Sequence, residues 1–597
     1  MIAALLYAVA VSVLSATALA FARGSLDALA AWTSLLAGAA FGAWSLWRDR
    51  RRIPSSAPAP PSPWEWAAIL LYTLVSARAF LWLVFTDGDH LRVLSPNNLG
   101  DLSLHLTYIH YLASGAPFWP DNPIFTGGKL TYPVGVDLFN AQLTVAGLDV
   151  QRGLLWVGCA GAALTGFALW RWGRAIALLA LLGNGGLAAL VVVQTRELAD
   201  FQSTLAWKNF FLALLVTQRG LLFALPAGLL LLASWRARFF GGNPNPAPKR
   251  DRDHLPLWGE LLLYASLPIF HLHTFLFLSL LLGTWFLLLP ALRPPLARLV
   301  GLAFLPATAL VLLVTGGLHG SSILGWKPGW MWDDASWITW CTDFLPGNPA
   351  LTAPLLFWPV NFGFTLPLIA WLGWKLWREE KVPINHQRST LNFPRACFPP
   401  ALGIFLLCVF VKFAPWEWDN TKIMIWSWLC LIPLAWQRLI APRPLWQRAL
   451  AILLLFGSGV ASLLGGLRGT GYDIASRYTR DGIAKAVAPL PIGARFAGYP
   501  TYNHPLLLCG RKMALGYPGH AWSHGLDYQP LAARIETLMN GEPDWQAAAV
   551  ELRVRYLLWA DNEREHYGNS PQPWKKLAPP IATGDWGQLY DLQSPAR

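Results

Sequence analysis

The sequence has few charged residues. Asp, Glu, Lys and Arg together make up 13% of its 597 residues, whereas 54% are hydrophobic. A typical soluble domain carries roughly 25% charged residues. So few charges cannot cover a water-exposed surface, whereas helices that face lipid need almost none. The composition therefore excludes an ordinary soluble protein and predicts a polytopic membrane protein, which also suits the 34 Trp residues, because their amphipathic rings favour the membrane–water boundary.

Cysteine is scarce as well. The six cysteines occur singly, without a C-x-x-C pair or metal-ligand spacing, so the sequence contains no zinc-finger pattern. Cys341 and Cys509 both fall on the side that we assign as extracytoplasmic, where a disulfide is compatible with the sequence but not required by it. A P-loop is absent, as is a D-x-D in a Rossmann-like context, which argues against a cytoplasmic nucleotide site.

The excess of basic residues does not indicate nucleic-acid binding. The formal net charge is +13, but the basic residues form short clusters between apolar runs instead of a stripe with stacking aromatics. This distribution is what the positive-inside rule requires of cytoplasmic loops. The expected partner is the lipid bilayer, with no nucleic acid.

Apolar runs of the length of a membrane span predict an α-helical membrane domain over residues 1–467 with about 13 spans. The alternating basic clusters place the N-terminus in the cytoplasm of a plasma (inner) membrane, and the loops 87–150, 316–350 and 413–422 outside. Residues 53–63 are a predicted linker. The predicted spans are Met1–Phe21, Leu26–Trp47, Trp64–Thr86, Leu154–Trp170, Ala175–Val193, Phe210–Trp235, Leu257–Phe270, Thr274–Leu292, Leu299–Gly316, Leu351–Trp374, Pro400–Phe413, Ile423–Trp436 and Ala449–Leu467.

Residues 468–597 differ in character, with more polar residues, Gly and Pro. Short apolar runs at Ala494–Gly498 and Arg555–Ala560 predict strands, and Leu531–Asn540 and Trp545–Arg553 predict helices. We expect a small extracytoplasmic α/β domain here.

The first outer loop carries the densest set of polar residues beside the membrane. Asp101 is predicted to N-cap a helix that runs to Ser114, with Gly115 as its C′ residue. His105 then lies one turn after Asp101 on the same face. Farther along the loop, Lys129 and Tyr132 are candidates for binding substrate.

This loop resembles the first extracytoplasmic loop of the GT-C superfamily of membrane glycosyltransferases, as found in aminoarabinose transferases and protein O-mannosyltransferases. Two features depart from the pattern: two spans precede the one before the loop, and Leu102 stands where a second acidic residue is common. The resemblance implies a GT-C-like fold and transfer of a sugar from a polyprenyl-phosphate-linked donor. The matching positions are Asp101, Ser114-Gly115, Pro120, Gly127-Gly128 and Tyr132-Pro133.

The chemistry of sugar transfer independently favours an acidic residue at Asp101. An acceptor hydroxyl must lose its proton as the new bond forms, and a carboxylate can remove that proton as a general base. A carboxylate can alternatively hold a divalent metal, so a metal is compatible with the sequence although no cofactor is required. The alternative is that Asp101 only caps a helix. His105 is a second candidate for the catalytic role, with an interfacial, backbone-satisfied histidine as its alternative.

A second cluster lies in the predicted outer loop 413–422. The ring of Trp416 can stack on a sugar, Asp419 and Asn420 can bind paired hydroxyls, and Lys422 can hold a lipid phosphate. The alternative is a tight interfacial loop anchored by its Trp residues, with Lys422 extending to the interface.

Three further basic side chains lie within or beside apolar runs. Arg219 is a candidate for phosphate binding, or for an ion pair with Glu197 or Asp200. His271 and His273 are candidates for facing substrate, with a satisfied pair in the core as the alternative, rather than for binding metal, because an H-x-H pair does not point to one side on a helix. In the C-terminal domain, His524 lies in a turn-rich aromatic segment that suits binding of a carbohydrate substrate or a partner, with a structural role as the alternative.

The sequence thus predicts a membrane glycosyltransferase that acts outside the membrane on a glycan, lipid or protein acceptor. Two alternatives remain open: a transporter or lipid flippase, and a non-catalytic envelope assembly protein. Transporters often repeat interrupted spans in two halves, and the sequence has no such repeat. If the protein is a transferase, Asp101 and the phosphate-binding cation must converge on one cavity.

Overall fold

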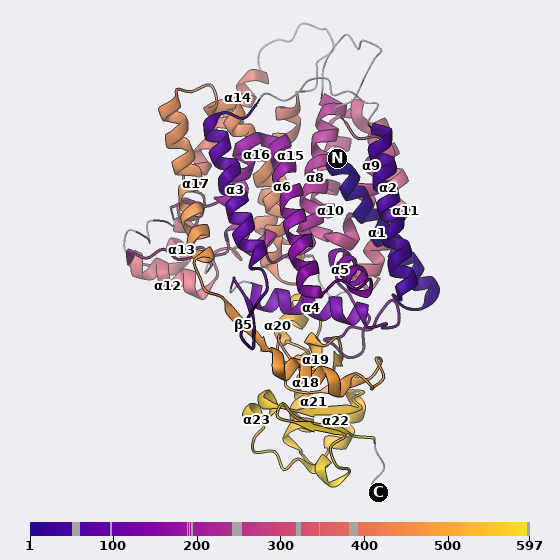
Figure 1. Ribbon diagram of the computed structural model, residues 1–597. Helices are drawn as coiled ribbons and strands as arrows, with labels where there is room; N and C mark the ends of the chain where they lie inside the picture. Colours follow the sequence, from indigo (N-terminus) through magenta and orange to yellow (C-terminus); the bar gives the residue numbers. More distant parts are fainter. Residues whose placement is uncertain are drawn as a thin grey trace.

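The computed structural model describes residues 1–49, 60–95, 98–187, 189, 192, 195–203, 205–240, 254–317, 324–345, 347–380 and 392–593. Its long apolar helices run side by side in a bundle, and the C-terminal segment forms a small domain at one end, here called the domain face (Figure 1). The bundle contains α1 (Ile2–Arg23), α2 (Ala28–Asp49), α3 (Pro63–Leu81), α6 (Val150–Leu182), α8 (Leu221–Phe240), α9 (Leu257–Phe270), α10 (Leu272–Leu288), α11 (Arg293–Thr315), α13 (Pro349–Phe362), α14 (Thr365–Glu380), α15 (Phe393–Phe410), α16 (Thr421–Ala435) and α17 (Leu445–Leu467).

Among the described residues, eight helices are long and apolar enough to cross a membrane, or nine if the pair α13 and α14 forms one bent span. The chain is therefore an integral membrane protein. The predicted number of about 13 spans is not confirmed. Helices α9 and α10 are shorter than a full span, α3 is not among the eight, and α13 and α14 meet at 79°. The predicted linker 53–63 and parts of the loop 316–350 lie outside the described residues.

Hydropathy and the structure agree on a break within α6. The predicted spans Leu154–Trp170 and Ala175–Val193 are separated where Gly173 and Arg174 leave helical geometry, and the second helical part ends at Leu182. At this break Arg174 forms an ion pair with Glu65, 2.6 Å away, in the first turn of α3. The basic residues Arg171 and Arg174, which separate the two apolar runs in the sequence, lie at this break.

Small residues set the distance between the first two helices. A Cβ on Gly38 of α2 would lie 2.4 Å from the carbonyl oxygen of Ala8 and 2.9 Å from Cβ of Ser12, both on α1. Because apolar side chains gain little by leaving lipid for a helix interface, such close backbone contact is a main source of stability in membranes.

We therefore expect Gly38→Leu to force α1 and α2 apart and to destabilise the protein by about 1–3 kcal/mol. The measurement is the thermal unfolding midpoint of the protein in nanodiscs. Gly403→Leu on α15 is the matched control, because a Cβ at Gly403 has no atom within 4 Å. Equal midpoints for the two variants would contradict this packing argument.

The first outer loop folds against the domain face. It contains β1 (Phe85–Asp87), β2 (His90–Val93), α4 (Leu99–Ala113) and α5 (Gly135–Val145), and α4 lies across the ends of the long helices (Figure 1). Strand β2 pairs antiparallel with β1 and with β5 (Tyr472–Ser476), which begins the C-terminal segment. Thr126 and Asp121 bind this segment as well, to the carbonyl of Ala514 at 2.9 Å and to Lys512 at 3.0 Å. The loop and the C-terminal domain thus form one packed unit.

The C-terminal domain is built on a five-stranded mixed sheet of order β7-β6-β8-β10-β9, in which β6 runs parallel to β7 and β8. The strands and helices expected from the sequence are present as β6 (Arg495–Ala497), β8 (Tyr556–Trp559), α21 (Gln529–Asn540) and α22 (Trp545–Glu551). The other elements are α18 (Arg477–Val487), α19 (Pro505–Leu508), β7 (Lys512–Met513), α20 (Pro518–Ser523), α23 (Asp561–His566), η6 (Pro573–Lys576), β9 (Ala582–Gly584) and β10 (Gly587–Asp591).

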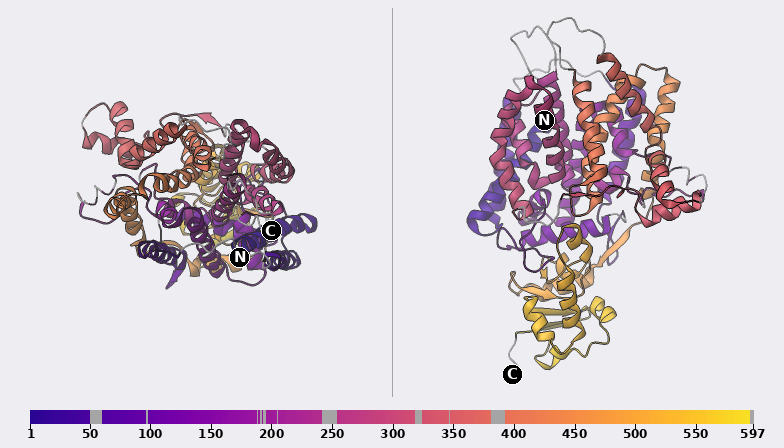
Figure 2. Two further views of the ribbon diagram at one scale, coloured as in Figure 1. Left: turned by 90° about the horizontal axis from the view of Figure 1, so that it is seen from above. Right: turned by 180° about the vertical axis from the view of Figure 1, so that it is seen from behind.

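Short elements interrupt or join the bundle helices. Helix α12 lies with α13 at the periphery of the bundle (Figure 2). Cys341 of α12 and Cys509 of the C-terminal domain are free thiols, so the disulfide considered from the sequence is not formed.

The short elements between the bundle helices are η2 (Phe211–Leu215), η3 (Pro290–Leu292), β3 (Gly325–Trp326), α12 (Ala335–Phe344), β4 (Val411–Lys412), η4 (Glu417–Asn420) and η5 (Trp436–Ile440).

Candidate active site

A cavity of about 150 Å³ opens where α4, α16 and α20 meet. We call it the polar cavity. Helix α4 and the Tyr132 segment come from the first outer loop, α16 comes from the centre of the bundle, and α20 comes from the C-terminal domain. Its lining residues are Asp101, Leu104, Tyr132, Lys208, Ala213, Thr217, Gln218, Trp416, Trp418, Asp419, Lys422, His520, Ser523 and His524.

Asp101 lies in the first turn of α4 rather than at its N-cap. The helix begins two residues earlier than predicted, with Asn98 at the N-cap, and Gly115 follows the C-cap Ser114 with a φ of 82°. The Asp101 carboxylate faces the polar cavity, and none of the described residues hydrogen-bonds to it. Burial raises the pKa of Asp101, while His105, Lys422 and Lys208 oppose the shift. A free carboxylate with a raised pKa is a stronger proton acceptor than an ordinary one.

Lys422 approaches the polar cavity from the opposite wall. It lies in the first turn of α16, a helix in which every residue is buried, and only 9% of Lys422 is exposed. Its ammonium group forms an ion pair with Asp419 at 2.9 Å. Because a buried charge is stable only when it is paired, an incoming anion would have to compete with Asp419 or share Lys422 with it.

Aromatic rings and a second cation complete this wall. The rings of Trp416 and Trp418 lie 5.1 Å apart, and Trp416 also contacts Trp522 of α20 at 5.9 Å. The ammonium of Lys208 lies 5.2 Å from the Trp418 ring. Sequence reasoning did not select Lys208, although a cation at the start of the apolar run Phe210–Trp235 is the kind of signal that could have identified it.

The C-terminal domain closes the polar cavity with His520, Ser523 and His524. The ring of His524 lies 5.0 Å from that of Tyr132, and its Nδ1 is buried without a hydrogen-bond partner among the described residues. Burial lowers the pKa of His520 to about 4 and that of His524 to about 3. Both imidazoles are therefore neutral near pH 7, and each can donate and accept one hydrogen bond.

His105 stands one turn after Asp101 but does not line the polar cavity. Its Nδ1 lies 2.9 and 3.0 Å from the two carboxylate oxygens of Asp137 in α5, and both side chains are buried. The His105 ring also lies 6.0 Å from that of Tyr132. Asp137 was not selected from the sequence, because its partner is 32 residues away in the chain. The pair fixes α4 against α5 beneath Asp101.

Two other predicted residues are occupied by protein contacts. Asn420 is fully buried, donates to the carbonyls of Cys408 and Val411, and accepts from the amide of Phe413. It therefore shapes the loop and does not line the polar cavity. Lys129 is 62% exposed and pairs with Asp121 at 3.0 Å, outside the cavity.

Arg219 also lies behind the polar cavity. It sits in the break between η2 and α8, fully buried, and donates to the carbonyl of Leu154 at 3.3 Å. The ion pair considered with Asp200 is not formed, since that carboxylate accepts from Ser462 at 2.5 Å. The neighbours Thr217 and Gln218 line the cavity instead.

His271 and His273 lie near Lys422 without lining the polar cavity. His271 N-caps α10, where its Nδ1 is 2.8 Å from the hydroxyl of Thr274 and accepts from the Thr274 amide. The two imidazole rings are 5.6 Å apart. The turn between α9 and α10 packs against the segment before α8, where a Cβ on Gly220 would overlap the carbonyl of Phe270.

The residue types at the polar cavity supply two carboxylates and two ammonium groups. Within the described part of the chain, no group of three or more His, Cys, Asp or Glu side chains is arranged to hold a metal ion. Asp101 and Asp419 face the cavity together with Lys208 and Lys422.

An apolar groove of about 450 Å³ runs along α14, α15 and α16. Residues of α16 belong to both sites: Lys422 faces the polar cavity, and Trp428, Leu431 and Ile432 line the groove. Since α16 rises about 1.5 Å per residue, the groove begins roughly 9 Å deeper in the bundle than Lys422. Its other walls include Phe362, Ile369, Phe398, Leu402 and Phe405.

Comparisons with known proteins give a fold-level likeness. No protein-family model matches the chain, and no curated protein matches it. Similar solved structures include the oligosaccharyltransferase of Archaeoglobus fulgidus in its apo form, with an inhibitory peptide and a dolichol-phosphate, and tethered to an acceptor peptide containing the NVT sequon. The identities are 10%, 10% and 12%; each match covers 83% of this chain and 69% of that chain, with a TM-score of 0.46.

These structural neighbours are archaeal oligosaccharyltransferases, members of the GT-C superfamily that the first outer loop resembles. At this identity and TM-score the likeness concerns the path of the chain alone. The function proposed below therefore rests on the residues of the polar cavity.

Proposed function

We propose that the protein is a membrane glycosyltransferase that moves a sugar from a polyprenyl-phosphate-linked donor to an acceptor hydroxyl. The observation that carries this proposal is the convergence of the free Asp101 carboxylate and the Lys422 ammonium on one cavity at the end of the helix bundle. In a phosphosugar, the anomeric carbon that forms the new bond is bonded directly to a phosphate oxygen. The base that acts on the acceptor hydroxyl and the cation that binds the phosphate must therefore share one site.

Each group has a distinct role in the proposed transfer. Asp101 takes the proton of the acceptor hydroxyl as its oxygen bonds to the anomeric carbon of the sugar. The bond between that carbon and the phosphate oxygen breaks at the same time, and its electron pair leaves with the polyprenyl phosphate. Lys422 and Lys208 stabilise the negative charge that develops on this leaving group. Trp416 and Tyr132 supply flat faces for the sugar ring.

The apolar groove supports a lipid-linked donor. Its walls suit an isoprenoid chain, and α16 contributes to both sites, with Lys422 on one face of the helix and Trp428, Leu431 and Ile432 on another. A soluble sugar nucleotide has no lipid chain that could occupy this groove. The basic residues support an extracytoplasmic site, because α2 and α8 end away from the domain face with Arg48 and Arg238 in their last turns.

The test is a transfer assay with the purified protein in nanodiscs. Lipid extract from the native membrane supplies candidate donors, and mass spectrometry detects free polyprenyl phosphate and a glycosylated acceptor. Release of polyprenyl phosphate coupled to acceptor glycosylation supports the proposal. Lipid-linked sugar that crosses the membrane without being consumed would instead identify a flippase.

The raised pKa of Asp101 predicts the pH dependence of transfer. The ionised carboxylate is the active form of a general base, so kcat/KM falls as the pH drops through the Asp101 pKa, and burial moves this point above the ordinary range of an Asp carboxylate. The measurement is kcat/KM for transfer between pH 3 and 8. The residual activity of Asp101→Asn should lack this acid limb. An acid limb that persists in Asp101→Asn would assign it to another group.

A further inference from the structure

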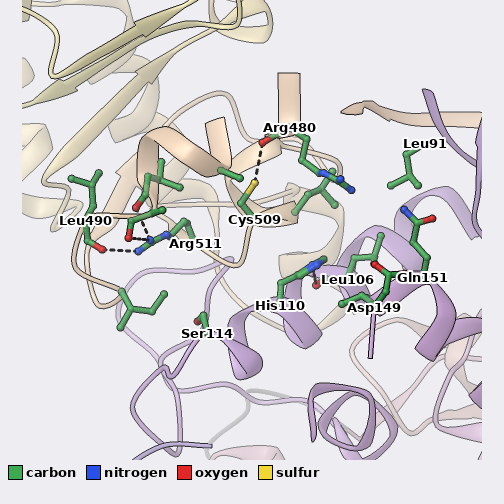
Figure 3. A pocket seen from close by; sticks show the side chains of 16 residues that line it. Leu91, Leu106, His110, Ser114, Asp149, Gln151, Arg480, Leu490, Cys509 and Arg511 are labelled. Carbon is green, nitrogen blue, oxygen red and sulfur yellow. Dashed lines mark hydrogen bonds between the residues drawn. The ribbon is translucent and has the colours of Figure 1, made fainter. Parts of the chain in front are cut away.

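A second cavity lies between the first outer loop and the C-terminal domain. It measures about 540 Å³, within the range of roughly 300–1,000 Å³ typical of small-molecule sites. Figure 3 shows its lining, which combines α4, the start of α6, β2, α18 and the segment around α19. We call it the interdomain cavity. It shares no lining residue with the polar cavity.

The two cavities lie on opposite faces of α4. Asp101 and Leu104 line the polar cavity, whereas Leu106, His110 and Ser114 line the interdomain cavity. At 3.6 residues per turn, His110 projects roughly opposite Asp101 on the helix. A ligand in the interdomain cavity is therefore not in contact with the proposed base, and the two sites can be occupied independently.

The polar atoms of the interdomain cavity include both donors and acceptors. Nδ1 of His110 donates to the carbonyl of Leu106 at 3.0 Å. Burial lowers the pKa of His110 to about 4, so the ring is neutral near pH 7 and its Nε2 can accept a hydrogen bond. Asp149 uses one oxygen to cap α6. Gln151 projects from the same helix end, and Arg480 extends toward it from α18 (Figure 3).

The charged groups around the interdomain cavity already have protein partners. Arg480 pairs with Asp481 at 2.8 Å. Arg511 donates to main-chain carbonyls, including those of Val487 and Leu490, and Asp149 accepts from the amide of Arg152. A ligand here is therefore bound mainly through hydrogen bonds. Leu106, Val150 and Leu508 add aliphatic surface.

We propose that the interdomain cavity is a second binding site, for a neutral saccharide. Every sugar hydroxyl both donates and accepts, which matches the mixed set of Asp149, Gln151, His110 and Arg480. The C–H faces of a pyranose match the aliphatic surface between these groups. Binding here goes beyond the proposed transfer, because it involves neither Asp101 nor a lipid phosphate.

The test measures binding, not transfer. Saturation-transfer NMR is recorded for the full-length protein in nanodiscs with maltotriose, cellotriose and chitotriose as probes. Ala484→Trp fills the cavity from α18 and is expected to abolish the signal, whereas Lys485→Trp, on the exposed side of the same helix, is expected to retain it. Gln151→Ala removes hydrogen bonds without changing the fold and should weaken binding about three- to tenfold, with exposed Arg152→Gln as its control.

Two results would overturn the inference: no signal with any of the three glycans, or an undiminished signal in both Ala484→Trp and Gln151→Ala. Asp101→Asn separates this inference from the proposed function. Saccharide binding should be unchanged in Asp101→Asn. If the unmodified protein binds saccharide but shows no transfer, the proposed function fails while this site stands.

Discussion

Replacing Asp101 by Asn is expected to lower the rate of sugar transfer by about 10²–10⁴-fold. The amide has nearly the same shape as the carboxylate but cannot accept the proton of the acceptor hydroxyl. The measurement is the initial rate of transfer in nanodiscs at saturating donor, together with the thermal unfolding midpoint. Because Asp101 makes no hydrogen bond to a described residue, the midpoint should move little.

Asp87→Asn is the matched control for Asp101→Asn. Asp87 belongs to the same outer loop, is 62% exposed, and pairs with Arg92 outside the polar cavity. Its variant should transfer sugar at the unmodified rate. If Asp101 only stabilises the N-terminus of α4, Asp101→Asn would lower the midpoint and leave the rate unchanged, which would contradict the assigned role.

Replacing Lys422 by Met is expected to reduce kcat/KM for the lipid-linked donor by about 10- to 100-fold, as for the loss of a hydrogen bond to a charged group. Met keeps much of the side-chain volume but supplies no charge to the leaving phosphate. The loss should appear in the donor kinetics, whereas the KM for the acceptor should change little. The measurement is a kinetic series in which donor and acceptor are varied separately.

Lys422→Met also leaves Asp419 buried without its partner, which by itself is expected to destabilise the protein. The double variant Lys422→Met/Asp419→Asn removes both charges and should recover stability without recovering donor kinetics. Lys129→Met, an exposed cation of the first outer loop, should behave like the unmodified protein. Recovery of transfer in the double variant would mean that Lys422 serves only to neutralise Asp419.

The arrangement around Asp101 gives the C-terminal domain a direct part in the proposed site. His520, Ser523 and His524 of α20 enter the polar cavity beside Tyr132, while β5 is paired with β2 of the first outer loop. The domain is thus tied to the loop that carries Asp101 by a shared sheet.

Much of the fold follows from local pattern. Apolar length identified the helices, and alternation and turn residues identified β6, β8, α21 and α22 in the C-terminal domain. Hydropathy predicted the break near Gly173, but its number of spans is not confirmed, because an apolar run is the same whether a helix is straight or bent, as between α13 and α14. Direction is set by packing between helices, and single-sequence hydropathy contains no information about it.

The sequence by itself determined the class of the protein, the helix that carries Asp101, and the segments that carry Tyr132, Trp416, Asp419, Lys422 and His524. These depend on composition, on one-turn spacing and on the cost of placing polar groups beside lipid, all of which act locally. Only the tertiary structure decided that these segments meet at one cavity, that Lys208 faces it while Arg219, His271 and His273 stand behind it, and that Asp137 holds His105. Contacts between residues tens to hundreds of positions apart form when buried surfaces fit together, and a pattern read along one chain cannot specify that fit.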